Sequence, residues 1–269
     1  TTIWNFIMIK KILKYVKRFF ILVVGISSLY LVNLFLMKPF SIDHFLGKEL
    51  VVDLIDSPEA LTYIGIFDRF NWITKHNSRL TIPSDDDINE EIESLEKSIK
   101  TLYKYKDSRL TDVQKNTKKI AIFDYENNLK ELKEFPHHDY PLNQIGGIHL
   151  NTIEFLSDMH PVRNISEAEG FIKRVNLIKQ VYEGTLKDLE KQADAGIYPP
   201  EFVYGHVIDQ LNEFISFTYE EHPLFTQFMK KVNDLDITSE EKASLEEAVK
   251  DGIDESVTPG FILLRDFMI

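Results

Sequence analysis

The stretch Tyr140-Pro141-Leu142-Asn143-Gln144-Ile145-Gly146-Gly147 interrupts a sequence that otherwise follows helical periodicity. Pro141 fixes its own φ and pushes the residue before it towards an extended conformation. Gly146-Gly147 permits a positive φ or a close backbone approach. Asn143 and Gln144 bring amide groups that need partners if they are buried. The stretch is therefore either a packed corner between helices or the wall of a site.

Before this stretch, Ser57-Pro58-Glu59 is a helix-start signal, with Ser57 as the cap and Pro58 at the first position of a short helix. Two longer helices are predicted after this short helix. Ser84 is expected to cap the first, with the carboxylates of residues 85–87 at the positive end of its dipole. The acidic run fits a helix start and a solvated face better than a metal site. The second helix is predicted over residues 111–132. The expected inward positions are Ile88, Ile92, Leu95, Ile99 and Leu102 in the first helix, and Val113, Ile120, Phe123 and Leu129 in the second.

The longest predicted helix follows the stretch and runs from Ser166 to Ala195. Ser166 and Glu169 have the spacing of a capping box, and Gly196 is a natural C-terminal cap. At ~1.5 Å per residue this helix would be roughly 45 Å long. Gly184 within it is expected to mark a bend or a close helix crossing.

Further helix starts are expected along the rest of the chain. A helix should follow Pro199-Pro200, with Phe202, Val203, Val207, Leu211, Phe214 and Ile215 inward. His222-Pro223 begins a shorter one, and Thr238 with Glu241 forms another capping box. An apolar segment, Phe261 to Ile269, ends the sequence. No strand pair with a hairpin turn stands out, so the predicted fold class is all-α.

The composition limits the chemistry. The chain has 269 residues, of which 43% are hydrophobic and 28% charged, as in ordinary globular proteins. Cysteine is absent, which excludes a disulfide framework, a thiol nucleophile and a cysteine-ligated zinc site. The formal net charge is -12. Because nucleic-acid affinity depends on basic side chains that release counterions, no nucleic-acid partner is expected.

The N-terminus contains an apolar run, FFILVVGISSLYLVNLFLM, from Phe19 to Met37. At ~1.5 Å per residue it spans roughly 28 Å, close to the ~30 Å hydrocarbon core of a bilayer. A core helix would show a polar stripe, and a cleaved signal peptide would have a shorter run that ends in small residues. The run therefore predicts an uncleaved transmembrane signal anchor, with the membrane as a partner through residues 19–37.

Basic residues before the run predict its orientation. Residues 1–18 contain five bases and no acid. The positive-inside rule keeps this segment cytoplasmic and places the body on the periplasmic or extracellular side. The predicted domains are residues 1–18, 19–37, a connector of short helices over 38–83, and a helical domain over 84–269. Met8 is the expected translation start.

Histidines raise the question of a metal site. His137-His138-Asp139 are neighbours in sequence, whereas His206 shares a helix face with Asp209 and Gln210. Zinc needs three or four converging ligands, so hydrogen-bonded histidines are the expected reading and no metal ligand is assigned. The H-E-x-x-H, G-x-S-x-G, P-loop and G-x-G-x-x-G motifs are all absent from the sequence. No catalytic residue is assigned.

Several short segments follow one another along the chain: Ser57-Pro58-Glu59, Thr62-Tyr63-Ile64-Gly65, Tyr140 to Gln144 with Gly146, Phe155-Leu156, His160-Pro161, and Gln192, Gly196 and Pro199-Pro200 followed by Gln210. Their order resembles the N-terminal part of the bacterial domain-of-unknown-function family 885, from about Gly47 onward. The resemblance implies an all-helical body like the N-terminal half of neurolysin or carboxypeptidase-Taq-type zinc metallopeptidases. It also implies an envelope location.

The resemblance also implies a missing part. The family's zinc-binding histidine-glutamate helix has no counterpart here, so zinc is expected only with a further C-terminal half, and the chain is expected to be truncated and inactive alone. In the intact protein, Tyr140, Asn143, Gln144 and Gly146 are the candidates for one side of a peptide-substrate cleft. The alternative hypothesis is a non-catalytic envelope binding or scaffold module.

Overall fold

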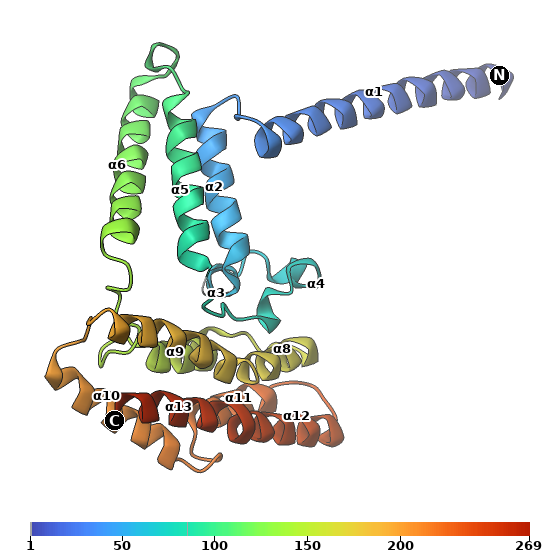
Figure 1. Cartoon of the computed structure of the whole chain (residues 1–269). Helices are drawn as coiled ribbons and strands as arrows, with labels where there is room; N and C mark the ends of the chain where they lie inside the picture. Colours follow the sequence, from blue (N-terminus) through green and yellow to red (C-terminus); the bar gives the residue numbers. More distant parts are fainter. Residues whose placement is uncertain (1, 85) are drawn as a thin grey trace. The chain divides into compact units, whose positions relative to one another are not determined.

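The computed structural model describes residues 2–84 and 86–269, and the side chains from residue 11 onward with the exception of residue 85. These residues form helices and connecting loops without a strand, which confirms the all-α prediction (Figure 1). Contacts within the chain divide it into two compact units. Unit 1 comprises residues 1–52 and 95–127, and unit 2 comprises residues 53–94 and 128–269. The sequence-based domain boundaries stay predictions.

Unit 1 contains the N-terminal helix α1 (Thr2–Leu36), most of α2 (Ile42–Asp56), and parts of α5 (Asp87–Tyr103) and α6 (Asp112–Glu134), with the turn η3 (Asp107–Arg109). Its core is small. The buried apolar residues are Ile42, Phe45, Leu102 and Tyr105. Within α1, the segment Lys11–Leu36 is the one stretch among the described residues that is long and apolar enough to cross a membrane.

The predicted inward face of α6 is wrong. Val113, Ile120 and Phe123 are 75%, 69% and 70% exposed. The side that packs on the core of unit 1 instead carries Ala121, Ile122 and Tyr125. Apolar residues lie on both sides of this helix, so periodicity alone selected the larger side chains and missed the side that carries Ala121.

Unit 2 is built from short helices. The first group is α3 (Pro58–Ile64), η1 (Asp68–Phe70), α4 (Asn71–Thr74) and η2 (His76–Ser78). The second is α7 (Ile148–Glu154) with the π-helical turn η4 (Phe155–Met159), α8 (Ile165–Val175), α9 (Ile178–Asp194) and α10 (Glu201–Ser216). The last is α11 (Pro223–Asn233), α12 (Ser239–Gly252), the π-helical turn η5 (Ile253–Val257) and α13 (Thr258–Met268).

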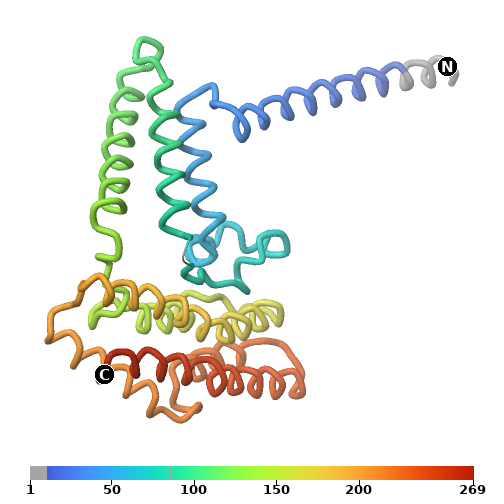
Figure 2. Tube along the Cα trace, viewed as in Figure 1, coloured from blue at the N-terminus to red at the C-terminus, as the bar shows by residue number. Residues whose placement is uncertain are grey.

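Two helical layers enclose the core of unit 2. The first consists of α8 and α9, and they pack on α12 and α13 of the second (Figure 1). Figure 2 shows that α12, η5 and α13 form one continuous helical rod. The predicted starts of α3, α10, α11 and α12 are confirmed: Ser57 and Thr238 cap through their side chains, and the Thr238–Glu241 capping box is complete. Phe202, predicted inward on α10, is 64% exposed and lies outside this core.

The long helix predicted from Ser166 to Ala195 is two helices. The chain tightens after α8, where the Leu177 N–H donates to the Arg174 carbonyl three residues earlier (3.0 Å), and α9 begins at Ile178. Asn164, rather than Ser166, caps α8 by accepting from the Glu167 N–H (3.0 Å). The error in the cap arises because sequence spacing does not show which of several polar residues has the extended backbone of a cap.

Gly184 does not mark a bend or a helix crossing. It lies inside α9, where a Cβ would come within 2.5 Å of the Pro83 carbonyl oxygen. An extended segment, rather than a helix, lies against α9 at this point. Gly196 does end α9 as predicted, with a φ of 72°.

Candidate functional site

The residues from Tyr140 to Gly147 fold as a corner held by one side chain. The Asn143 Oδ1 accepts from the backbone N–H groups of Ile145 (3.0 Å) and Gly146 (2.8 Å), and its Nδ2 donates to the Tyr140 carbonyl (3.0 Å). An asparagine that bonds its own turn in this way replaces backbone pairing. The packed-corner interpretation therefore accounts for Asn143.

Gly147 serves close approach rather than an unusual dihedral angle. Its φ is -64°, which any residue adopts. An added Cβ would lie 2.6 Å from the Asn143 carbonyl oxygen and 2.7 Å from the His149 ring. Gly146 lacks this constraint, because its nearest neighbour would be the Asn151 side chain at 3.8 Å. Only Gly147 is required by packing.

A buried histidine ties the corner to α10. The Gln210 Nε2 donates to the Gln144 carbonyl (3.1 Å), which leaves its Oε1 facing the His149 Nε2 at 3.0 Å. His149 must therefore carry its hydrogen on Nε2. Burial lowers the pKa of His149, so the ring is neutral near pH 7. Its Nδ1 is buried and has no hydrogen-bond partner among the described residues.

A polar cavity of about 350 Å³ opens between the corner and α10. Gln144, His206, Asp209, Gln210 and Glu213 line it. The two carboxylates and the amide oxygens are acceptors that suit a positively charged group. Among the described residues, the Gln144 side-chain amide makes no hydrogen bond, so it remains available to a ligand.

An apolar cavity of about 230 Å³ lies at the other end of the corner, where Tyr140 and Leu142 form part of its wall together with residues of α9, α10 and α13. Gln192 fixes the wall, because its Nε2 donates to the Asp139 carbonyl at 2.6 Å. The lining residues are Tyr140, Leu142, Leu189, Gln192, Ala193, Ile197, Tyr198, Pro199, Tyr204, Phe267 and Met268.

The structure separates the four predicted cleft residues. Tyr140 lines the apolar cavity and Gln144 lines the polar one. The amide of Asn143 is used within the turn, and the Gly146 carbonyl accepts from the Asn151 Nδ2 (2.8 Å). The corner thus offers one side chain to each cavity.

The described residues do not fit a zinc site. None of their histidine, aspartate and glutamate side chains form a group of three or more that could hold a metal ion. The His138 Nδ1 lies 3.1 Å from the Pro136 carbonyl, and Asp139 accepts from Gln192. His206 and Asp209 line the same cavity. Among the described residues, no third histidine, aspartate or glutamate lies close enough to them to complete a metal site. No zinc chemistry can be assigned to these side chains.

Sequence reasoning missed a buried arginine. Arg174 is fully buried, and its guanidinium donates to the Arg79 and His76 carbonyls (2.8 and 2.9 Å) and to the Thr62 hydroxyl (2.7 Å). The signal was present: Arg174 follows Phe171 by three residues and precedes Ile178 by four, so it lies on the buried face. A cation on the buried face of a helix predicts that polar groups lie in the core to bond it.

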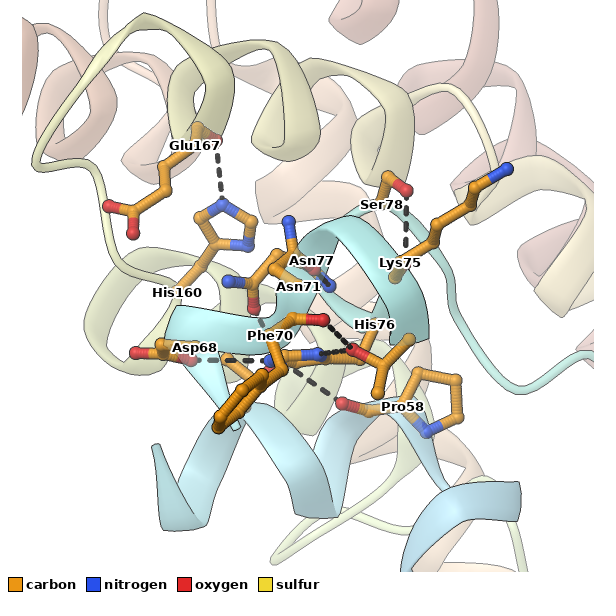
Figure 3. A network of polar contacts seen from close by, with 12 residues as sticks. Pro58, Asp68, Phe70, Asn71, Lys75, His76, Asn77, Ser78, His160 and Glu167 are labelled. Carbon is orange, nitrogen blue, oxygen red and sulfur yellow. Dashed lines mark hydrogen bonds and ion pairs between the residues drawn. The ribbon is translucent and has the colours of Figure 1, made fainter. Parts of the chain in front are cut away.

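His160 completes the bonds of Arg174. The Arg174 Nη1 lies 2.9 Å from the His160 Nδ1, so that nitrogen accepts and Nε2 donates to the Glu167 carbonyl (3.0 Å; Figure 3). Burial and the Arg174 charge lower the pKa of His160 to about 3. The neutral His160 ring accepts a hydrogen bond from the buried Arg174 cation, so each residue needs the other as its partner.

An acidic layer lies outside this pair. Asp68 accepts from Arg163 (2.5 Å) and lies 3.2 Å from the His76 Nε2 (Figure 3). Burial raises the pKa of Asp68, but the hydrogen bonds from Arg163 and His76 outweigh it and lower the pKa below the usual value. Arg163 also forms a bidentate pair with Glu167 (2.7 and 3.0 Å). The network joins the turns of η1 and η2 to α8, which indicates a structural role.

Two comparisons place this fold among known proteins. A solved structure from Colwellia psychrerythraea, described as a "putative lipoprotein", is similar to this chain with a TM-score of 0.67 and 17% sequence identity. The similarity covers 80% of this chain and 40% of that one, so this chain spans less than half of the solved protein. At this identity the likeness shows the fold alone. The comparison with curated proteins found no match.

The family comparison gives the clearest result. Residues 58–269 match the family described as "Bacterial protein of unknown function (DUF885)". The match begins eleven residues after Gly47, where the sequence resemblance was expected to start, and includes the corner and both cavities. The chain therefore belongs to the DUF885 family of bacterial proteins of unknown function.

Proposed function

We propose that this chain is the membrane-anchored, outward-facing helical region of a metallopeptidase-like protein and that it binds peptides at the corner. The observation that carries the proposal is the position of Tyr140 and Gln144, which line an apolar and a polar cavity at the two ends of one short loop. The two cavities together suit a peptide, because its apolar side chains and its charged groups bind best in different surroundings.

The two cavities define the peptide. Asp209 and Glu213 favour an amino terminus or a basic side chain, and the uncommitted amide of Gln144 can pair with a peptide carbonyl. The apolar cavity suits an aliphatic or aromatic side chain. Because the described residues do not fit zinc, we assign hydrolysis to no residue of this chain.

The test measures binding of a dye-labelled peptide, Lys-Leu-Ala-Ala, by fluorescence anisotropy to the full chain in neutral detergent micelles. Glu213→Gln and Gln144→Ala should each raise the Kd about tenfold, since each removes one charged or polar contact. Glu247→Gln on α12, which removes a charge outside the cavities, is the matched control. Unchanged binding by both cavity variants would exclude the corner as a peptide site.

The anchor has a separate support and test. The segment Lys11–Leu36 is 26 residues long and spans ~39 Å at ~1.5 Å per residue, enough for a bilayer. The bases before the apolar run favour a cytoplasmic N-terminus. Sequencing of the mature N-terminus should recover residues before Phe19. A mature chain that begins after Met37 would mean a cleaved signal peptide and a released body.

The second candidate is a non-catalytic envelope binding or scaffold module. It is favoured by the internal bonds of the corner, where Asn143 and Gln210 are already committed to neighbours within the chain. The peptide-binding assay discriminates between the two. Saturable binding that Gln144→Ala and Glu213→Gln weaken would exclude the scaffold interpretation, whereas no peptide binding by the wild-type chain would favour it.

A further inference from the structure

A basic pocket lies in unit 1 beside the end of α1. Its volume is about 310 Å³, and its wall includes Lys38, Lys104, Lys106, Arg109, Tyr105 and Gln114. These six residues define the basic pocket. Its basic residues come from the segment after α1 and from the turns around η3, so they are brought together by folding rather than by one charged run.

The cations of the basic pocket are not neutralised by carboxylates. Among the described residues, Lys38, Lys104, Lys106 and Arg109 form no ion pair, whereas the nearby Lys115 and Lys118 bond Asp112 and Asp107 (both 2.8 Å). One carboxylate lies near the rim: Asp43 accepts from Gln114 (2.6 Å) and from the Ser41 hydroxyl (3.2 Å). Four cations therefore face one carboxylate, and that carboxylate is already bonded.

Lys38 is held in place at the pocket wall. Its ammonium lies 4.0 Å from the centre of the Tyr105 ring. The Tyr105 hydroxyl in turn donates to the Pro39 carbonyl (2.7 Å). A cation over a ring keeps its hydrogen-bond donors free for an anion.

The pocket is joined firmly to α1. Asn33, within the last turn of that helix, donates to the Lys38 carbonyl and accepts from the Phe40 N–H (both 3.0 Å). Lys38 follows the last residue of α1 by two positions, a reach of roughly 7 Å. Leu36, Met37 and Phe40 are 79%, 66% and 75% exposed beside it. If α1 crosses a bilayer, the pocket must lie at the level of the lipid headgroups.

We propose that the basic pocket binds the phosphate of an anionic phospholipid headgroup in the membrane that α1 crosses. The inference rests on the proposed anchoring. The charge of the part of unit 1 that follows α1 supports it: residues 38–52 and 95–127 have 10 basic and 7 acidic residues, whereas unit 2 has 16 basic and 36 acidic ones. An anionic surface attracts this part of unit 1 and repels unit 2.

The test uses the full chain in neutral detergent micelles with equal amounts of phosphatidylglycerol and phosphatidylcholine, and native mass spectrometry counts the retained lipids. The wild type should retain phosphatidylglycerol preferentially. Lys104→Gln/Lys106→Gln/Arg109→Gln should lower that preference by about tenfold, since each cation near an anionic headgroup contributes to retention. Lys97→Gln/Lys100→Gln/Lys119→Gln removes the same charge from unit 1 outside the pocket and should leave the preference unchanged.

Three outcomes would overturn the proposal. No loss in the pocket variant, or an equal loss in the control variant, would mean that the pocket is not a specific site. Displacement of the lipid by millimolar inorganic phosphate, with phosphate retention lost in the pocket variant, would assign the pocket to a free phosphate. The micelle assay does not require α1 to span a bilayer, so it is independent of the anchor. Carbonate extraction of native membranes tests the anchor separately, because release of the chain contradicts the anchor alone.

Discussion

The two units of this chain have opposite constructions. Unit 2 encloses a large apolar core around a fully buried cation, Arg174, and carries a formal net charge of -20. Unit 1 has four buried apolar residues in its core, among those described, and carries +8. Burial of apolar surface is the main favourable term in folding, so unit 2 has the larger reserve of stability. The two units therefore differ both in the size of the core and in the sign of the charge.

Arg174→Met should produce the largest change in the stability of unit 2 relative to unit 1. It removes the donors for the Arg79 and His76 carbonyls and leaves the His160 Nδ1 without its donor. A loss of about 3 kcal/mol or more of unfolding free energy is expected, because buried acceptors lose their bonds together. Hydrogen exchange with mass spectrometry should show lost protection in residues 160–190 and unchanged protection in residues 95–127.

Arg69→Met is the control for Arg174→Met. Arg69 is exposed in the same unit and its replacement should change the free energy by no more than about 0.5 kcal/mol. Equal losses of protection in the two units of the Arg174 variant would mean that they do not unfold separately.

Acid should destabilise unit 2 through its buried histidines. Burial lowers the pKa of His160 to about 3, with a contribution from Arg174, and burial lowers the pKa of His222 to about 4. The unfolded chain, with an ordinary pKa of about 6.5, binds more protons below that pH, so stability is full above pH ~6.5 and falls as the pH drops towards 4. At pH 5 each histidine contributes a loss of about 2 kcal/mol.

His222→Asn tests the pH effect at one residue. The His222 Nδ1 caps α11 by accepting from the Leu224 N–H (3.2 Å), and asparagine is also a good cap. The slope of unfolding free energy against pH, measured by urea denaturation between pH 5 and 6, should fall by about one bound proton. An unchanged slope would mean that His222 is not the neutral, buried group inferred here.

Phe123→Ser in unit 1 should produce the smallest effect. The side chain is 70% exposed, so its loss should change the unfolding free energy by no more than about 0.5 kcal/mol. Leu102→Ala, from the buried core of the same unit, should cost about 2 kcal/mol or more. A large loss of hydrogen-exchange protection in residues 95–127 of the Phe123→Ser variant would show that the exposed side of α6 is covered in solution.

The sequence predicted those features that depend on neighbouring residues. The caps at Ser57 and Thr238, the starts after Pro200 and His222, and the end at Gly196 are local, and the structure confirms them. The inward face of α6 and the break after Val175 depend on which surface the rest of the chain offers.

The candidate sites, too, could be predicted from the sequence only where they depend on neighbouring residues. The corner was recognisable because Pro141 and Gly147 alter the backbone locally. Its two cavities were not predictable, since their other walls come from α9, α10 and α13. The Arg174 network joins residues more than 100 positions apart, such as Thr62 and Arg174. Only the folded chain brings those groups together. From the sequence alone, Arg174 could be recognised only as a charged residue on an otherwise apolar helix face.

The π-helical turn η5 fixes the phase of the last helix. A π turn holds one residue more than an α turn, and each residue rotates a helix by roughly 100°. Regular α-helical winding of the same residues would turn Phe261 and Leu264 by roughly 100° away from the core, where both are fully buried. It would also misplace the Ser256 hydroxyl, which accepts from the Lys179 N–H (3.1 Å). The insertion of a single residue thus sets the angular register of α13 against α9.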